Sequence, residues 1–393
     1  MANMELIATA TFGLEAVVKR EVQRLGYTVL RSEDAKITFA GDESAVPRAN
    51  LWLRCADRVL VKMGEFRAES FEELFEGTKK LPWEEWIPED GKFTVNGTSV
   101  KSKLFSLSDC QKIIKKSVVE RLKKTYPVEV FPETGALYGI RFTILKDVVT
   151  LSIDTSGPGL HKRGYRSANV QAPIKETLAA AMVELSFWNP DRVLVDPFCG
   201  SGTILIEAAM IGKNIAPGLS RSFVSEQWGR IDEKLWKDTR AEAFRAIRND
   251  KELKIYGSDI DPKAVSAARV NASRAGLSDD IVIRRRSFEE LKMPGEHPII
   301  ITNPPYGERI GDREALERIY YKMDRILARD KTCSLYLITA DKDFERSLRS
   351  RKKADRRRKL YNGRIETTYY QYYGEKPNQT ERKEINDNDQ SNG

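Results

Sequence analysis

Residues 192–203 contain the glycines and the carboxylate that a binding site for a small ligand requires. They read Arg-Val-Leu-Val-Asp-Pro-Phe-Cys-Gly-Ser-Gly-Thr, which predicts a buried strand, a glycine turn and the start of a helix. Gly200 and Gly202 would let a ligand lie against the backbone without interference from Cβ atoms. A P-loop needs a lysine after the last glycine, and a dinucleotide fold needs glycine or alanine where this chain has Leu205. The segment therefore favours a nucleoside-bearing ligand without phosphates, with Asp196 available to receive a cationic ammonium group.

S-Adenosylmethionine (SAM) has these features, and a second segment favours it over an ordinary strand–turn–helix junction of another α/β enzyme. Asp259 closes the next strand, where a carboxylate can accept hydrogen bonds from both ribose hydroxyls. Asp261 fits a helix N-cap equally well. Ser287-Phe288, after the third strand, fits either an adenine contact or a plain loop. The predicted cofactor-binding residues are Asp196, Phe198, Cys199, Gly200, Ser201, Gly202, Thr203, Asp259, Ile260, Asp261, Ser287, Phe288 and Asn303.

The tetrapeptide Asn303-Pro304-Pro305-Tyr306 follows an apolar strand and suits methyl transfer to an exocyclic amine. Such an amine is a poor nucleophile because its lone pair is delocalised into the ring. The Asn303 side-chain oxygen and the Pro304 carbonyl can accept its two N–H bonds, and the prolines fix both acceptors. Tyr306 offers a face for stacking the base, which contributes about 1–3 kcal/mol. We predict catalytic roles for Asn303, Pro304 and Tyr306; the alternative is a proline turn without chemistry.

The rhythm of apolar residues indicates two architectures in the chain. The first ~155 residues alternate short strands with helices, an α+β pattern. It predicts strands over 4–10, 27–32, 35–41, 90–100 and 136–157, and helical stretches over 13–26, 51–63 and 109–126. From residue 192 onward, apolar strands separated by helical segments predict a doubly wound, mostly parallel sheet. Near the end, Asn362-Gly363 predicts a hairpin within 356–373.

Charge and cysteine usage exclude several classes of protein. The formal net charge is +8, and basic residues cluster, which points to a polyanionic partner. Four scattered cysteines and two histidines make a zinc site and disulfides unexpected, so we predict no metal. No apolar stretch is long enough for a signal peptide or a membrane span. We expect a cytoplasmic protein without a membrane partner.

The quoted segments resemble a known family. LVDPFCGSGT, GSDID and NPPYGERI look like the class I amino-methyltransferases, although NPPY is shared by N6-adenine, guanine-N2 and glutamine-N5 enzymes. Residues ~45–155 resemble a THUMP RNA-binding domain preceded by a ferredoxin-like part. The junction LHKRGYR…APIKETLAAAMV and the insert APGLSRSFVSEQWGRIDEKLWKD resemble the THUMP-linked guanine-N2 methyltransferases of bacterial 23S rRNA. The second methyltransferase that is fused to this unit in some bacteria is not found here, so we expect one activity.

This resemblance implies a fold and a domain plan. We expect an α/β chain with a Rossmann-like, seven-stranded class I methyltransferase domain behind an N-terminal α+β ferredoxin-like/THUMP domain. The implied parts are a ferredoxin-like region over 1–65, THUMP over 66–157, a linker over 158–171, the SAM-dependent methyltransferase domain over 172–375 and a disordered tail over 376–393. The resemblance also implies that the Ala172 backbone faces the methionine end of the cofactor.

Basic residues predict where RNA would bind. Lysines before and on the helix at 109–126 form a stripe, although a solvated face is the usual fate of such residues. Cations mixed with aromatics around Tyr165, and the run 349–359 leading into Tyr361, suit phosphate contacts and base stacking. Whether the triplet 284–286 is structural or faces the substrate stays open. The predicted RNA-binding residues are Lys101, Lys103, Lys112, Lys115, Lys116, Arg163 and Arg166.

The resemblance thus favours transfer of a methyl group from SAM to N2 of a guanine in 23S rRNA. A THUMP-type tRNA guanine-N2 methyltransferase is the nearest alternative, because it shares the domain plan and the tetrapeptide. DNA adenine methylation would need a target-recognition domain after the catalytic sheet. A non-catalytic RNA-binding module is the alternative of another class, and the intact NPPY beside an intact cofactor loop argues against it.

Overall fold

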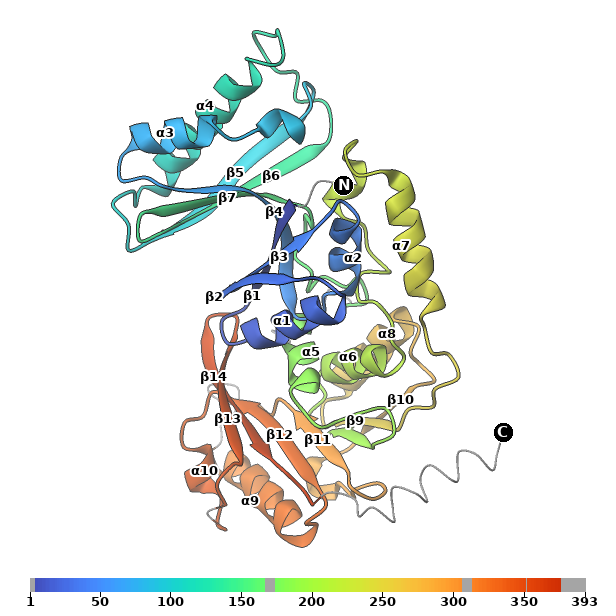
Figure 1. Ribbon diagram of the computed structural model, residues 1–393. Coiled ribbons are helices and arrows are strands. Elements are labelled where there is room, and N and C mark those ends of the chain that lie inside the picture. The colour runs from blue at the N-terminus through green and yellow to red at the C-terminus, as the bar shows by residue number, and fades with distance from the viewer. Residues whose placement is uncertain (1–3, 167–173, 306–312, 351, 376–393) are drawn as a thin grey trace. The chain divides into compact units, whose positions relative to one another are not determined.

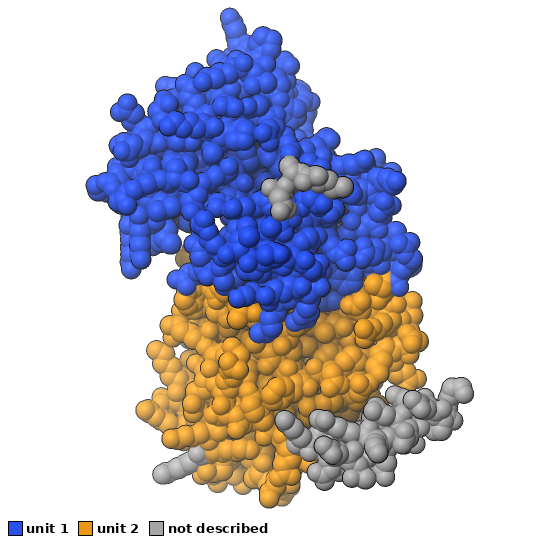
Figure 2. Space-filling model, viewed as in Figure 1, with its two compact units in different colours: residues 1–11, 18–162, 216–245 blue, residues 12–17, 163–215, 246–393 orange. Residues whose placement is uncertain are grey.

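The computed structural model describes residues 4–166, 174–305, 313–350 and 352–375 (Figure 1). The chain divides into two compact units, each assembled from separate stretches of sequence (Figure 2). Unit 1 contains residues 1–11, 18–162 and 216–245, and unit 2 contains residues 12–17, 163–215 and 246–393. Within the described ranges, no helix combines the length and the apolar character that crossing a membrane requires.

A single seven-stranded sheet, in the order β2-β3-β1-β4-β7-β6-β5, organises unit 1. All its pairs are antiparallel except β5 with β6. The long strand β4 links the two halves of the sheet, because its first residues pair with β1 and its last residues pair with β7. The strands are β1 (Met4–Ala10), β2 (Val29–Glu33), β3 (Lys36–Gly41), β4 (Ala56–Arg67), β5 (Lys92–Val100), β6 (Leu137–Leu145) and β7 (Val148–Asp154).

Strand β4 corrects the helix predicted over 51–63. Only its first two residues are helical, and residues 56–67 form the strand. Arg54, Arg58 and Lys62 recur every four residues, which imitates one face of a helix. In the structure Arg58 instead forms an ion pair with Asp154, and Lys62 forms ion pairs with glutamates of β1 and β4. Carboxylates within the sheet thus neutralise charges that the sequence alone places on a solvated helix face.

The other predicted elements of unit 1 are confirmed, with ends that differ by a few residues. Gly26, with φ of +89°, ends the first helix as the C-cap that its position suggested. The helices before the insert are α1 (Glu15–Arg24), α2 (Ala45–Trp52), α3 (Phe71–Lys79), the 3-10 helix η1 (Trp83–Glu85) and α4 (Leu107–Leu122).

Residues 216–245 fall between two elements of unit 2 in sequence but pack in unit 1. They contain the 3-10 helix η2 (Val224–Gln227) and α7 (Glu233–Arg245). Trp228 stacks on Tyr138 with ring centroids 4.8 Å apart, and its indole N–H donates to the Leu137 carbonyl. Arg221 holds the segment that leaves β7 by donating to the carbonyls of Ser156, Pro158, Gly159 and Lys162.

A second seven-stranded sheet forms unit 2, in the order β10-β9-β8-β11-β12-β14-β13. Its first five strands are parallel, and β14 and β13 are antiparallel additions at one edge. This confirms the doubly wound sheet predicted from the strand rhythm. The strands are β8 (Leu194–Asp196), β9 (Ile255–Asp259), β10 (Ile281–Arg285), β11 (Ile299–Thr302), β12 (Ser334–Thr339), β13 (Arg356–Asn362) and β14 (Ile365–Tyr372).

Helices cover both faces of this sheet (Figure 1). Tyr320, Met323 and Leu327 of α9 pack in one apolar cluster with alternate residues of β8, β11 and β12. The other face meets α6, because a Cβ atom on Gly257 of β9 would lie 2.2 Å from the Leu205 side chain. The helices are α5 (Glu176–Glu184), α6 (Thr203–Gly212), α8 (Pro262–Arg274), the 3-10 helix η3 (Phe288–Glu290), α9 (Arg313–Arg329) and α10 (Phe344–Ser347).

The predicted hairpin joins β13 and β14, with a turn one residue later than expected. Asn362 is the last residue of β13 and pairs with Ile365. The two turn residues are therefore Gly363, with φ of +64°, and Arg364. Glycine at the first turn position supplies the positive φ that two-residue hairpins need.

Candidate active site

The glycine loop after β8 has an open backbone surface. Gly200 has φ of +52°, and apart from its chain neighbours no described residue has an atom within 4 Å of the position that its Cβ would take. Gly202, at φ of +80°, precedes α6, and its Cβ would lie 3.2 Å from the Ala268 Cβ. The Asn271 side chain donates to the Ser201 carbonyl and so fixes the loop from α8. The loop is therefore preformed, and it leaves room for a ligand at Gly200.

Asp196 is a buried carboxylate at the end of β8. It is 1% exposed and accepts hydrogen bonds from the Thr302 hydroxyl at 2.7 Å and from the Phe198 backbone N–H at 3.2 Å. Burial raises its pKa to about 7, because the charged form loses its hydration, while these hydrogen bonds oppose the shift. A cationic group nearby would favour the ionised form, as the predicted ammonium contact requires.

Asp259, at the end of β9, connects the glycine loop with the start of α8. Its Oδ2 accepts from the Gly200 N–H and its Oδ1 from the Asp261 N–H, both at 3.0 Å. A carboxylate has about four acceptor positions, so it retains capacity for ribose hydroxyls. Asp261 is the N-cap of α8 and accepts from the Lys263 N–H at 2.8 Å. Ile260, between these two aspartates, has an apolar side chain that is 67% exposed.

The remaining predicted cofactor residues divide between surface and core. Phe288 is 6% exposed and packs against Phe198 with ring centroids 4.9 Å apart, so only its backbone can face a ligand. The Ser287 hydroxyl accepts from the Glu289 N–H and starts η3. Cys199 is buried, which raises its thiol pKa well above the usual value. Ser201 and Thr203 are buried, with their hydroxyls 3.3 Å apart.

Asn303 follows β11, next to the Thr302 that bonds Asp196. Its side-chain oxygen Oδ1 is buried and has no hydrogen-bond partner among the described residues. A buried acceptor without a donor is costly, commonly about 1–3 kcal/mol, and a ligand that donates an N–H here would remove this cost. Pro304 is buried beside it. Tyr306 and Ala172 lie outside the described residues, as do residues 167–171 of the linker and the tail 376–393, and the expectations for them stay predictions.

Arg163 and Arg166, which the sequence predicts to contact RNA, both have partners within unit 2, and their contact with RNA stays a prediction. Arg163 is 3% exposed and donates from two guanidinium nitrogens to Glu207 of α6, which also accepts from the Tyr165 hydroxyl. Arg166 donates to the Thr203 hydroxyl and forms an ion pair with Glu176 at 3.1 Å. Both arginines therefore attach residues 163–166 to the helix behind the glycine loop. Nothing near Arg163 in the sequence indicates its partner, because Glu207 lies 44 residues away.

The five predicted RNA-facing lysines lie in unit 1. Lys101 and Lys103 precede α4, and the other three are exposed on that helix. Several have carboxylate neighbours: Lys103 pairs with Glu69, and Lys112 lies 3.6 Å from Asp109. Lys115 lies 3.5 Å from Glu133 and over the ring of Phe93, and Lys116 lies over the ring of Phe75. Their binding to RNA stays a prediction.

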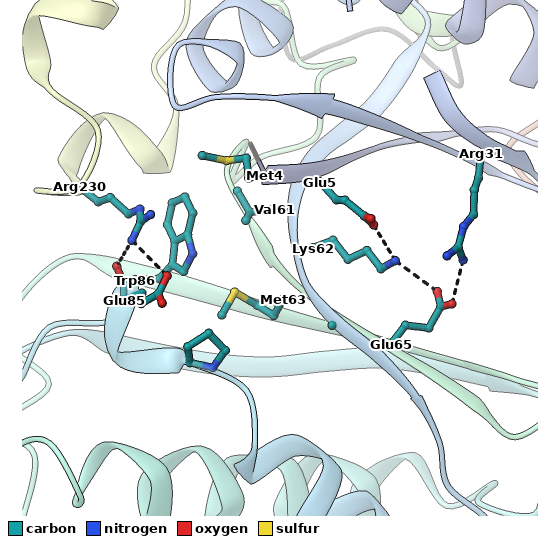
Figure 3. Close-up of a pocket in the computed structure, with 12 residues that line it drawn as sticks. Met4, Glu5, Arg31, Val61, Lys62, Met63, Glu65, Glu85, Trp86 and Arg230 are labelled. Carbon is teal, nitrogen blue, oxygen red and sulfur yellow. Dashed lines mark hydrogen bonds and ion pairs between the residues drawn. The ribbon is translucent and has the colours of Figure 1, made fainter. Parts of the chain in front are cut away.

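Unit 1 also contains a groove between β4, η1 and the insert (Figure 3). Its volume is about 530 Å³. Every cation that lines it faces a carboxylate: Arg31 pairs with Glu65, Lys62 with Glu5 and Glu65, and Arg230 with Glu85. Arg230 also lies over the Trp86 ring at 4.5 Å. The groove is neutral overall, so its charges do not select a polyanion.

Within the described residues no group of three or more histidine, cysteine, aspartate or glutamate side chains is placed to hold a metal ion. The candidate site consists of the glycine loop, the two aspartates and the Asn303 turn. An open glycine backbone, a carboxylate with spare acceptor positions and a second, buried carboxylate together fit a nucleoside that carries an ammonium group.

Comparisons with known proteins agree with this fit. Residues 163–371 match the RMKL-like methyltransferase domain, residues 5–60 the RlmL ferredoxin-like domain and residues 68–154 the THUMP domain. The chain is 48% identical over 375 residues to YpsC of Bacillus subtilis, which is named as a candidate RNA methyltransferase; the match covers 95% of this chain and 97% of YpsC.

Two similar solved structures are also described as methylating enzymes. SMU.472, a candidate methyltransferase crystallised with SAH, the product form of SAM, is 42% identical, with a TM-score of 0.90 over 96% of this chain and 100% of that chain. A Listeria monocytogenes protein described as a predicted N6-adenine-specific DNA methylase is 50% identical, with a TM-score of 0.90 over 95% of this chain and 97% of that chain.

Fold, site and comparisons define a class I methyltransferase with S-adenosyl-L-methionine as its cofactor. The chain belongs to the RMKL-like methyltransferase family and carries the ferredoxin-like and THUMP domains of its RlmL-type members. This confirms the family resemblance, the fold class and the cofactor that the sequence suggested.

Proposed function

We propose that the protein methylates RNA, and that its target is the exocyclic N2 amine of a guanine in 23S rRNA. The buried, unpartnered Oδ1 of Asn303 carries this proposal. An amide oxygen can only accept hydrogen bonds, so the missing partner is a donor, such as an N–H of an exocyclic amine. The cofactor supplies a methyl group on a sulfonium.

Residues at the ends of β8, β9 and β11 would have separate roles in the reaction. Asn303 Oδ1 and the Pro304 carbonyl accept the two N–H bonds of the amine and turn its lone pair toward the methyl group. Asp196 binds the cofactor ammonium, Asp259 binds the ribose, and the open backbone at Gly200 accepts the remainder of the cofactor. The amine becomes acidic as the carbon–nitrogen bond forms, so a strong base is unnecessary. Positioning of the two reactants supplies most of the rate enhancement.

Five observations support RNA as the substrate, and two of them, the ferredoxin-like region and the insert, favour 23S rRNA. A THUMP domain occupies residues 68–154, and the similar protein YpsC is named for RNA. The ferredoxin-like region matches the RlmL type, and the insert at 216–238 resembles that of the rRNA enzymes. The chain carries an excess of 8 positive charges. The Asn303 turn fits an adenine amine as well, and the name of the Listeria protein makes DNA adenine the second candidate.

Nucleoside mass spectrometry separates these candidates. We would compare 23S rRNA, tRNA and DNA from cells with and without the gene, and from cells complemented with wild type, Asn303→Ala or Asn249→Ala. Asn249 is an exposed asparagine of the same unit and serves as the matched control. We expect N2-methylguanosine to disappear from 23S rRNA without the gene and to return with wild type and Asn249→Ala only. Loss of N2-methylguanosine from tRNA alone, or of N6-methyladenine from DNA, would overturn the proposed target.

A further inference from the structure

The sheet of unit 2 has a hollow that is not lined by the residues assigned above to binding of the cofactor or the amine. Its volume is about 130 Å³, and we call it the β10 hollow. Its floor is apolar, and cationic side chains surround it. Its main lining residues are Val195, Tyr256, Val282, Arg284, Arg286 and Lys292.

Strand register places this hollow on the face of the sheet opposite α6. Val195, Tyr256 and Val282 are neighbours across β8, β9 and β10, and Ser258 neighbours Arg284 in the next row. Val195 packs in the cluster that contains α9. Gly257, between the two rows, faces α6 instead. Because successive residues of a strand point to opposite faces, the hollow lies on the α9 side.

This part of the sheet is incompletely covered. Helix α9 packs against β8, β11 and β12, whereas β10 is the edge strand. Val282 is 40% exposed as a result. Beyond β10 the chain continues into η3 and the segment that contributes Leu291 and Lys292 to the wall. An exposed apolar floor at a sheet edge offers a contact surface for a planar group.

The three cations of the β10 hollow have no side-chain partner among the described residues. Within the part of the chain that the structure describes, Arg284, Arg286 and Lys292 form neither an ion pair nor a side-chain hydrogen bond. The neighbouring Glu289 faces Arg318 instead. In the groove of unit 1, by contrast, each lining cation faces a carboxylate. Unneutralised charge concentrated around an apolar floor fits a polyanion that also carries aromatic rings.

We propose that the β10 hollow is a subsite for the substrate RNA strand. Arg284, Arg286 and Lys292 contact its phosphates, and one unstacked base lies on the floor beside Tyr256. This inference rests on the proposal that the substrate is RNA. Strand β10 is three strands from β11, or about 14 Å at the usual spacing of about 4.8 Å. A short single-stranded stretch can span that distance from the base held at Asn303.

The test removes two of the cations. The variant Arg284→Ala/Arg286→Ala is compared with Arg274→Ala/Lys331→Ala, which removes the same charge from exposed positions elsewhere in unit 2. Binding of a fluorescent single-stranded 20-nucleotide RNA and of protein-free 23S rRNA is measured against salt, in the presence of SAH. We expect the arginine variant to bind both RNAs about tenfold more weakly than the control at 0.15 M salt. The slope of log K against log[salt] should be shallower by about 1.4, because each single-strand phosphate contributes about 0.7.

Two further readouts make the result specific. SAH affinity and melting temperature should match the control, and Arg284→Lys/Arg286→Lys should regain most of the RNA affinity because lysine keeps the charge. Unchanged RNA affinity and salt slope would overturn the subsite. A loss confined to SAH affinity would also overturn it and assign the arginines to the cofactor site. These binding measurements need no methyl transfer, so their failure is distinguishable from a wrong target nucleotide in the mass spectrometry.

Discussion

The pH dependence of cofactor binding tests the role of Asp196. Its pKa is about 7 because burial penalises the carboxylate. If the cofactor ammonium binds the ionised form, binding at low pH must first expel a proton. The affinity for SAH should then rise with pH up to about 7 and level off above it.

The magnitude follows from the fraction of Asp196 that is ionised. With a pKa of about 7, this fraction is about 0.09 at pH 6 and about 0.91 at pH 8. The dissociation constant for SAH should therefore be about tenfold higher at pH 6 than at pH 8. Binding should release about 0.9 protons at pH 6 and about 0.1 at pH 8.

Isothermal titration calorimetry in buffers of different ionisation enthalpy measures both quantities. Asp196→Asn should bind SAH more weakly at pH 8 and lose the pH dependence, whereas Asp279→Asn, an exposed control, should keep it. Equal wild-type affinities at pH 6 and pH 8, with no proton release, would refute the role given to Asp196. The folded pKa lies above the unfolded one, so protonation stabilises the free protein at low pH and this contribution is lost as pH rises toward 7. Asp196→Asn should accordingly melt higher than wild type at pH 8 without ligand.

Three further predictions concern the loop, its support and the catalytic turn. Glu207→Ala removes the carboxylate that faces buried Arg163, so it should lower the free energy of unfolding by about 3–5 kcal/mol and the melting temperature by at least about 6 °C. The control Glu296→Ala, at an exposed position, should leave both quantities unchanged. Gly202→Ala and Gly276→Ala should each lower the free energy of unfolding by about 1–2 kcal/mol, because both glycines have positive φ. Only Gly202→Ala should weaken SAH binding in calorimetry. Equal SAH affinities of the two variants would contradict the cofactor role of the loop. Asn303→Ala should lower kcat by about 10²–10³-fold with RNA and SAH affinities nearly unchanged, and a collapse of RNA affinity instead would make Asn303 structural.

The features of the site that the sequence predicts all lie at strand ends. Asp196, Asp259 and Asn303 each follow an apolar run, and parallel strands bring such ends to one edge of a sheet. The glycine loop was also readable, because Gly200 and Gly202 adopt the positive φ that glycine tolerates. Local chemistry and strand order were sufficient for these residues.

The features that the sequence did not predict depend on partner residues that are distant in the chain. Nothing near Arg163 indicates that Glu207 buries it, and nothing near Arg58 indicates that Asp154 holds it in a strand. The insert reads as part of the catalytic sequence, yet Trp228 packs on Tyr138, 90 residues earlier in the chain, as part of unit 1. Thr302 was overlooked, although its position before Asn303 could have suggested a contact with Asp196 across the adjacent strands.

Every role proposed for the site requires that Asn303 holds the amine that accepts the methyl group. A crystal structure of the protein with SAH and its RNA target would measure this directly. We expect Asn303 Oδ1 to lie about 2.7–3.2 Å from the exocyclic nitrogen of a flipped guanine. An Asn303 oxygen bonded to a donor of the protein, with the guanine bound elsewhere, would contradict it.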